Sequence, residues 1–211
     1  APASTAPAFT APAPASALPA LLAVPFLLMG GFVATYNFLT YRLTDPPFHV
    51  SETVVGGVFL TYLAGTLASA LAGRAADRWG RPPVLLLSIA LMAAGLLLTL
   101  PPSLPAVVAG LLVFTSGFFG AHSVASGWAP VISPRHGSAL YVLAYYAGSS
   151  VFGAAVGLGW AAGGWPLTVT VITAMIALAA TASASVVKAT RRRGRGPAAR
   201  RRAHPGPKVA A

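Results

Sequence analysis

The amino-acid sequence predicts an all-α integral membrane protein with six transmembrane helices. Of its 211 residues, 56% are hydrophobic and only 8% are charged, whereas about 25% of the residues of a soluble domain are charged. The mean hydropathy is +0.74, and residues 82–134 and 136–187 contain no Asp, Glu, Lys or Arg. This composition excludes a soluble globular protein. It also excludes disorder in the body of the chain, because disorder requires low hydrophobicity and high charge.

The spans follow from the length that a helix needs to cross the bilayer, about 20 apolar residues for roughly 30 Å of hydrocarbon. At 1.5 Å per residue, residues 82–134 would form a helix of about 80 Å, too long for one crossing. The three prolines within 101–105 divide this segment, because proline cannot continue a helix. Residues 136–187 divide likewise at Gly-Gly-Trp-Pro, 163–166. We therefore expect spans at 18–41, 53–73, 83–100, 106–127, 138–161 and 166–187.

The sequence has three predicted regions. Residues 1–17 form an Ala/Pro-rich linker, whose prolines favour an extended chain and which lacks the basic segment of a signal peptide. Residues 18–187 form the six-helix bundle, and residues 188–211 form a basic tail. Because the sequence starts at Ala1 without methionine, we expect it to be an internal piece or a processed product.

The distribution of charge predicts the orientation. With six spans both termini share a side, and 13 of the 14 Lys and Arg residues fall there, all except Arg42. The positive-inside rule makes that side, with both termini, cytosolic. The tail follows a span directly, so we expect it to anchor on anionic lipid of the bilayer. It has no aromatic residue for base stacking, and we therefore expect no nucleic-acid partner.

The segment between the second and third predicted spans contains a spaced motif. Gly73, Asp77, Arg78, Gly80 and Arg81 give the pattern G-x-x-x-D-[RK]-x-G-R. Small residues at 73 and 80 allow a tight turn, and the Asp77 carboxylate can accept hydrogen bonds from a neighbouring helix N-terminus. The positive-inside rule alone would explain the two arginines. The complete spacing is more specific, and we expect a gating or structural role for it.

This motif resembles the loop signature of the major facilitator superfamily, found between the second and third helices of a six-helix half. All five motif positions match, although prolines 82 and 83 stand where basic residues usually follow. Segments 26–37, 117–126 and 145–150 are similar to the C-terminal half of YnfM-type inner-membrane transport proteins, which are described as arabinose-efflux-permease-like. The resemblance covers about residues 20–187.

The resemblance implies a fold and a partner. Such proteins have twelve spans in two halves, so this chain would be one half of the fold, built as 3+3 inverted repeats. Residues 1–17 would end the linker between the halves. The N-terminal six-helix half, absent from this chain, would be the partner. The protein would be a multi-pass component of the plasma membrane, the inner membrane of a bacterium.

Polar and aromatic side chains inside the spans are candidates for a substrate cavity, because such residues mark pathways or interhelical hydrogen bonds. His122 is the only histidine well inside a span, and the ordinary titration range of histidine suits a proton-linked switch. Packing or helix capping is the alternative for His122, and a structural hydrogen bond or interface anchoring is the alternative for the others. The cavity candidates are Tyr36, Asn37, Thr115, Phe119, His122, Ser126, Tyr145 and Ser149.

Small residues recur at four-residue spacing in the second and fifth predicted spans, where they allow close helix approach in lipid. Packing within the bundle explains this pattern. The resemblance implies a second role, because the corresponding helices of the family meet the other half and rock against it. The candidates for this rocking interface are Gly57, Gly65, Ser69, Gly153 and Gly157.

The predicted function is secondary active transport of a small organic solute or drug by alternating access, with proton-linked efflux. No Asp or Glu lies in a predicted span, so a proton-relay carboxylate would belong to the other half, or His122 would serve. The sequence has no cysteine, which excludes thiolate metal sites, disulfides and cysteine nucleophiles. We expect no metal and no cofactor. A truncated, inactive or split half-transporter is the alternative. An intramembrane enzyme is a remote one, because the sequence has no G-x-S-x-G.

Overall fold

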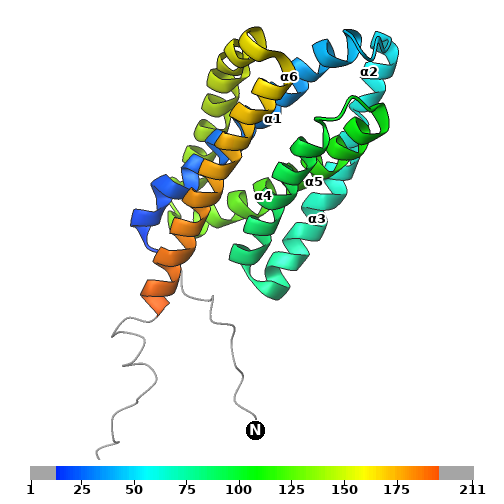
Figure 1. Ribbon diagram of the computed structural model, residues 1–211. Helices are drawn as coiled ribbons and strands as arrows, with labels where there is room; N and C mark the ends of the chain where they lie inside the picture. Colours follow the sequence, from blue (N-terminus) through cyan, green and yellow to red (C-terminus); the bar gives the residue numbers. More distant parts are fainter. Residues whose placement is uncertain (1–12, 195–211) are drawn as a thin grey trace, which may run out of the picture.

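The computed structural model describes residues 13–194, which form an all-α bundle without strands, and it confirms the predicted fold class. Figure 1 shows long helices that run up and down the molecule. The elements are η1 (Ala15–Ala17), α1 (Leu18–Thr44), α2 (Glu52–Val58), α3 (Thr61–Trp79), α4 (Arg81–Leu98), α5 (Leu104–Ile132) and α6 (Gly137–Gly194).

Five helical stretches of the described residues are long and apolar enough to cross a membrane, with α2 and α3 forming one of them. Helix α6 contains a kink, because Gly163 and Gly164 leave the helical φ/ψ region and Gly164 has a φ of 60°. Glycine adopts that conformation without a Cβ clash. The chain therefore folds back on itself there (Figure 1). We call residues 137–162 the first arm and 165–194 the second arm; each exceeds the length of one crossing.

Counted with the two arms separate, the helices agree roughly with six spans. Helices α3, α5 and α6 continue past the ends expected for the spans, at 73, 127 and 187. A helix does not end where the hydrocarbon ends, since its backbone hydrogen bonds are satisfied equally well in water. The division of the chain into linker, bundle and tail stays a prediction.

Glycines set the closest helix contacts. A Cβ on Gly110 of α5 would lie 2.7 Å from the carbonyl oxygen of Gly95 on α4. Likewise, a Cβ on Gly30 of α1 would lie 2.8 Å from the carbonyl oxygen of Gly148 on the first arm. Backbones can approach so closely only where neither residue has a side chain between them. Such van der Waals contact replaces the hydrophobic drive that lipid removes.

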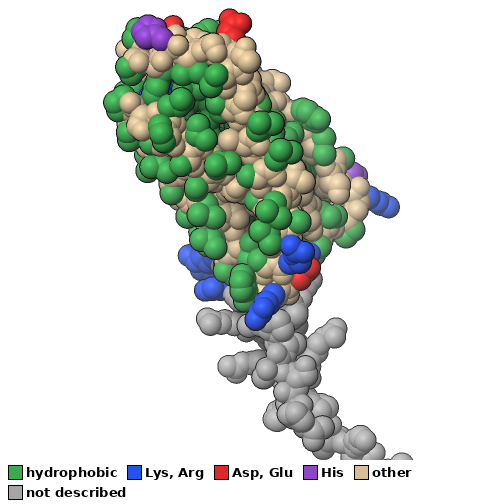
Figure 2. Space-filling view, turned by 90° about the vertical axis from the view of Figure 1, so that its right-hand side faces the viewer, with side chains coloured by type: hydrophobic (Ala, Val, Ile, Leu, Met, Phe, Trp, Pro, Cys, Tyr) green, Lys and Arg blue, Asp and Glu red, His purple; other side chains and the backbone are tan. Residues whose placement is uncertain are grey.

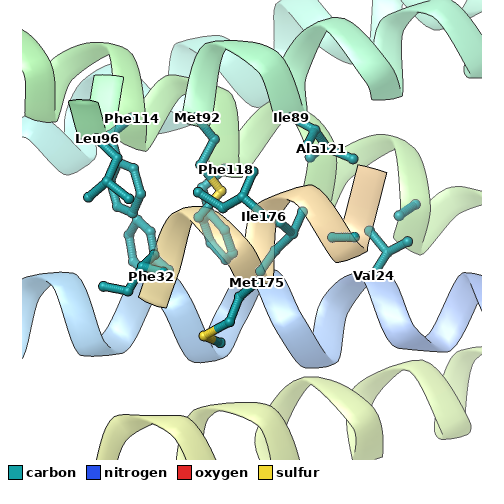
Figure 3. Close-up of a cluster of buried hydrophobic side chains, with 14 of the residues drawn as sticks. Val24, Phe32, Ile89, Met92, Leu96, Phe114, Phe118, Ala121, Met175 and Ile176 are labelled. Carbon is teal, nitrogen blue, oxygen red and sulfur yellow. The ribbon is translucent and has the colours of Figure 1, made fainter. Parts of the chain in front are cut away.

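The centre of the bundle lies between α1, α4, α5 and the second arm (Figure 3). The rings of Phe32 and Phe118 stack with their centroids 4.0 Å apart, and Phe114 is fully buried. Helix α3 packs on α5 at one side, and the first arm packs on α1 at the other. The labelled core residues are Val24, Phe32, Ile89, Met92, Leu96, Phe114, Phe118, Ala121, Met175 and Ile176.

The two ends of the bundle differ in charge. Figure 2 shows Lys and Arg side chains gathered mainly at the lower end, where α1 begins and α6 ends. We call this the basic end. The acidic residues Asp45 and Glu52 follow α1 at the opposite end. Which end faces the cytosol stays a prediction.

Arg42 ties three elements together at the opposite end. Its Nη2 donates to the carbonyl oxygens of Leu100 (2.9 Å) and Pro101 (3.1 Å). Both residues lie in the turn between α4 and α5. Its guanidinium also lies 5.1 Å from the ring of Trp165, and the Trp165 Nε1 donates to Thr99 Oγ1 at 3.2 Å. In the sequence Arg42 indicates only a charge outside the spans; in the structure it acts as a clamp that connects α1, the α4–α5 turn and the kink of α6.

Candidate functional site

Tyr36 lies at the centre of a buried hydrogen-bond chain that joins α1, α3 and α5. Its hydroxyl is 2.7 Å from Thr61 Oγ1 and 2.6 Å from Thr115 Oγ1. Thr61 already donates its proton to the carbonyl oxygen of Val58 at 2.8 Å. Because each hydroxyl has one proton, Tyr36 donates to Thr61 and Thr115 donates to Tyr36. Two of the predicted cavity residues are thus brought together as a structural link between helices.

An open groove lies beside the hydrogen-bond chain of Tyr36, between the second half of α1 and the α2–α3 junction. Its volume is about 560 Å³, within the roughly 300–1,000 Å³ range of small-molecule sites. Asn37 is exposed and lies in the wall of this groove. The groove is lined by Val33, Tyr36, Asn37, Phe38, Thr40, Tyr41, Phe59 and Tyr62.

His122 forms a second polar junction, between α5 and the first arm. The hydroxyl of Tyr141 lies 3.0 Å from His122 Nδ1. The ring of Tyr145 is 5.1 Å from the imidazole, and Phe118 stacks on it at 6.0 Å. His122 and Tyr145 are therefore close together, and both remain partly exposed.

Aromatic rings connect the groove to the His122 junction. Neighbouring ring centroids along this path are 4.9 to 6.0 Å apart, which is the range of favourable aromatic contacts. The path crosses four helices, and no member carries a formal charge when His122 is neutral. We call it the aromatic row; its members are Tyr36, Tyr62, Phe119, Phe118, His122 and Tyr145.

The aromatic row lies at the middle of the bundle. Phe118 is the central residue of α5, which runs from Leu104 to Ile132. Thr115, which bonds to the first member of the row, is seven residues before His122, about 10 Å along the helix. This length is about one third of the roughly 30 Å that a membrane-spanning helix crosses.

The two predicted serines lie outside the row. The hydroxyl of Ser126 donates to the carbonyl oxygen of Ser123, and that of Ser149 donates to the carbonyl oxygen of Tyr146. Each bond stays within its own helix turn. Thr115, Phe119 and His122 interact with side chains of other helices, whereas the hydrogen bond of Ser126 stays on α5.

The small residues of the two stripes differ in their surroundings. A Cβ on Gly65 would lie 2.5 Å from the Phe119 ring, and those on Gly153 and Gly157 would meet Val33 and Phe38 of α1 at 3.3 and 3.1 Å. Ser69 donates to the carbonyl oxygen of Phe119 at 3.3 Å. These four therefore pack within the bundle. In contrast, a Cβ on Gly57 would meet no atom within 4 Å.

The loop motif sits at the basic end between α3 and α4. Gly80 has φ 89° and ψ 153°, and its N–H donates to the carbonyl oxygen of Ala76 at 2.9 Å. This conformation favours glycine, so Gly80 produces the tight turn that the sequence suggested. Asp77 and Arg78 are exposed, Arg81 is half-buried at the start of α4, and a Cβ on Gly73 would find open space.

The sequence did not identify Tyr62 and Phe118 as contributors to the site, and it indicated only an interface anchor at Tyr141. Tyr62, Phe118 and Tyr141 complete the aromatic row and its hydrogen bonds. Tyr141 lies one turn before Tyr145, and this spacing placed both on one helix face in the sequence; nothing in the sequence distinguished Tyr62 from its neighbours. Among residues 13–194, no three His, Asp or Glu side chains come together as a metal site.

Comparison with known proteins places the chain in a family. The family model described as Major Facilitator Superfamily matches residues 16–210. The chain is 38% identical over 162 residues to the "Uncharacterized MFS-type transporter YybF" of Bacillus subtilis (strain 168), which covers 75% of the chain and 40% of that relative. No solved structure matches the chain.

A second relative has higher identity. The "Inner membrane transport protein YnfM" of Escherichia coli (strain K12) is 46% identical over 154 residues, covering 70% of the chain and 36% of that relative. An "Uncharacterized transporter" of Buchnera aphidicola subsp. Schizaphis graminum (strain Sg) is 37% identical over 143 residues, covering 66% of the chain and 35% of that relative. The chain thus spans about two fifths or less of the length of these relatives. The chain belongs to the Major Facilitator Superfamily, in agreement with the resemblance seen in its sequence.

Proposed function

We propose that the chain forms one half of a secondary transporter that moves a small organic solute or drug across the bacterial inner membrane by alternating access. The observation that carries this proposal is the aromatic row, which crosses four helices at mid-depth and ends in an open groove. Transporters of this architecture bind substrate near the bilayer midplane, where their repeats meet. The names of the relatives, which are transporters, support the same class.

The chemistry of the row and groove indicates the substrate. Rings supply most of the surface, and the Asn37 amide and the hydroxyls of Tyr41 and Thr40 supply hydrogen-bonding groups. Aromatic faces bind apolar rings, sugar faces and organic cations. The groove lining contains no Lys or Arg to bind a carboxylate or phosphate. We therefore propose a neutral or cationic solute, exported in exchange for protons.

The His122 junction is the proposed point of proton linkage in this half. Its imidazole has a tyrosine hydroxyl at hydrogen-bond distance and neighbours the row through Phe118 and Tyr145. A charge on this ring would therefore be felt by a bound solute and by the α5–α6 contact. Enzymatic activity is not part of the proposal, since the nearby hydroxyls of Ser123 and Ser126 donate to backbone carbonyls rather than to His122.

The partner in this proposal is an N-terminal six-helix half. The match to only about two fifths of each relative supports it, and so does the free space at Gly57 and Gly73 on the α2–α3 stretch, where another helix can approach. Gly65 and Ser69 are occupied by α5, so the proposed rocking surface is the remaining exposed side of that stretch.

Co-expression tests the proposal. The chain is expressed in a bacterial strain together with the N-terminal half of the E. coli relative, and cellular ethidium and radiolabelled L-arabinose are measured. We expect lower accumulation of at least one probe with both halves than with either alone, and loss of this difference after a protonophore. Accumulation unchanged for both probes, with both halves present and co-purifying from the membrane, would support the inactive-half alternative instead.

A matched pair of variants connects transport to the row. Tyr145→Ala removes a row member. Tyr146→Ala removes the next ring, which contacts Tyr145 with a centroid distance of 5.3 Å but is 62% exposed at the surface and contacts no other row member. Loss of one aromatic contact corresponds to roughly a threefold to tenfold weaker substrate interaction. We expect that loss for Tyr145→Ala alone; equal transport by the two variants would argue against the row as the substrate path.

A further inference from the structure

A second groove lies at the basic end, away from the aromatic row, between α4 and the second arm of α6. Its volume is about 470 Å³. One part of its wall is apolar and the other part is basic. It is lined by Leu86, Ala184, Val187, Lys188, Arg191 and Arg192.

The groove straddles the expected edge of the hydrocarbon layer. The second arm starts at Trp165, and about 20 residues of helix cross roughly 30 Å, which brings the edge near residue 185. Lys188 and Arg192 therefore lie just beyond it, at headgroup level. On the other wall, Leu86 is five residues after the start of α4 at Arg81, about 7.5 Å inside the layer.

The order of residues along the second arm matches an amphiphilic ligand. Positions 184, 187, 188, 191 and 192 follow the i, i+3, i+4 spacing of one helix face. Along this face the side chains change from Ala184 and Val187 to Lys188, Arg191 and Arg192 in two turns. Val187 is only 8% exposed, whereas the side chains of Lys188, Arg191 and Arg192 lie exposed at the surface.

The charge at this end favours an anion. The whole sequence has three acidic residues, Asp45, Glu52 and Asp77. The first two lie at the opposite end, and Asp77 belongs to α3, which does not line the groove. A guanidinium binds phosphate oxygens through paired N–H donors, and an ammonium adds a further charge. Figure 2 shows hydrophobic side chains adjoining the basic ones near this end.

We propose that this groove is a specific site for one anionic phospholipid of the adjacent leaflet. The phosphate lies against Lys188, Arg191 and Arg192, and an acyl chain lies along Leu86, Ala184 and Val187. Basic pockets between transmembrane helices bind such headgroups. A bound lipid would fasten α4 to the second arm at the point where α6 leaves the membrane, so the site goes beyond transport itself.

Native mass spectrometry of the purified 211-residue chain tests the site, with phosphatidylglycerol and phosphatidylcholine as probes in detergent. We expect one retained phosphatidylglycerol and no retained phosphatidylcholine. The variant K188Q/R191Q/R192Q should bind about 100-fold more weakly, at roughly fivefold per basic residue. The matched control R74Q/R78Q/R135Q removes the same charge at the same end outside the groove, and should change binding less than about twofold.

Two further arms separate a shaped site from surface charge and from a free anion. Ala184→Trp fills the apolar part of the groove while every basic side chain remains, and should abolish retention. Excess inorganic phosphate should leave the lipid bound. Four results would each overturn the proposal. Lipid binding could fall equally in the two triple variants, or phosphatidylglycerol could be retained by K188Q/R191Q/R192Q. It could also be retained by Ala184→Trp, or inorganic phosphate could displace it. Circular dichroism checks that all variants remain helical.

Discussion

The hydrogen-bond chain at Tyr36 leads to a quantitative prediction for Tyr36→Phe, which removes one oxygen and keeps the ring. The variant loses the contacts of 2.6 Å to Thr115 and 2.7 Å to Thr61. Thr61 keeps its own bond to the Val58 carbonyl. Thr115, which is 0% exposed, loses the acceptor for its proton. The packing of the ring against Phe32 and Tyr62 is unchanged.

The expected size of the effect follows from these contacts. Side-chain hydrogen bonds between transmembrane helices contribute about 0.6 kcal/mol on average and up to about 1.7 kcal/mol. Two lost bonds therefore lower the free energy of unfolding of Tyr36→Phe by roughly 1–2 kcal/mol. Thr115→Val removes one bond and should cost about 0.6 kcal/mol. The double variant should cost about as much as Tyr36→Phe alone, because the bond shared by the two residues is already lost.

Reversible unfolding in mixed micelles of mild detergent and dodecyl sulfate, followed by circular dichroism, measures these differences. Tyr146→Phe is the control, since its ring is 62% exposed and its hydroxyl should contribute less than about 0.3 kcal/mol. The hydrogen-bond chain is not a structural link if Tyr36→Phe is as stable as the control. The same holds if the loss of stability in the double variant equals the sum of the losses in Tyr36→Phe and Thr115→Val.

Three further variants follow from single contacts. Arg42→Gln loses charge-assisted bonds to two backbone carbonyls and a cation–π contact, so its free energy of unfolding should fall by about 2–3 kcal/mol in the same assay. Gly80→Ala forces a side chain into φ 89° and should cost roughly 1–3 kcal/mol. His122→Gln keeps a polar side chain but removes the titrating ring, and proton-linked transport by the co-expressed halves should fall about tenfold or more, equivalent to about 1.4 kcal/mol or more.

Matched controls accompany these variants. Arg74→Gln removes an exposed arginine and should change stability by less than about 0.5 kcal/mol; an equal loss in both arginine variants would contradict the clamp. Gly73→Ala enters open space within α3 and should be neutral or stabilising, since alanine favours helix. Tyr141→Phe accompanies His122→Gln and tests whether proton-linked transport depends on the hydrogen bond between the Tyr141 hydroxyl and His122. Unimpaired transport by His122→Gln would show that His122 is not part of the proton pathway.

The sequence was sufficient for the features that depend on composition along the chain. Charge-free length and the Gly-Gly at 163–164 predicted helices with a break, and the structure has the kink of α6 at those glycines. The spacing around Gly80 predicted a turn, and only glycine readily adopts the conformation found there. In both cases the determining physics is local to a few residues, and a single sequence shows it.

Contacts between helices were less accessible from the sequence. Small residues in the second span indicated close packing but not which neighbour packs there; the structure places α5 at Gly65 and leaves Gly57 open. Likewise, the sequence does not distinguish Tyr62 and Phe118 from lipid-facing aromatic residues. Only the structure shows that Tyr62 contacts Phe119 and that Phe118 contacts Phe119 and His122. The sequence indicated only a topology charge at Arg42, because its hydrogen-bond acceptors are backbone carbonyls more than fifty residues away. A helix sequence shows which face can pack, whereas the partner depends on the folded arrangement.

Cysteine accessibility tests alternating access, the central claim, most directly. The chain contains no cysteine, so each single variant carries one thiol. Asn37→Cys places it on one side of the aromatic row, and Ser126→Cys places it on the other side. Each variant is co-expressed with a cysteine-free N-terminal half. Labelling by a membrane-impermeant maleimide is measured from each side of the membrane, with and without a proton gradient. We predict reciprocal changes: a gradient that raises labelling at position 37 from one side lowers labelling at 126 from the other. Rates that rise together, or do not respond to the gradient, would contradict the account.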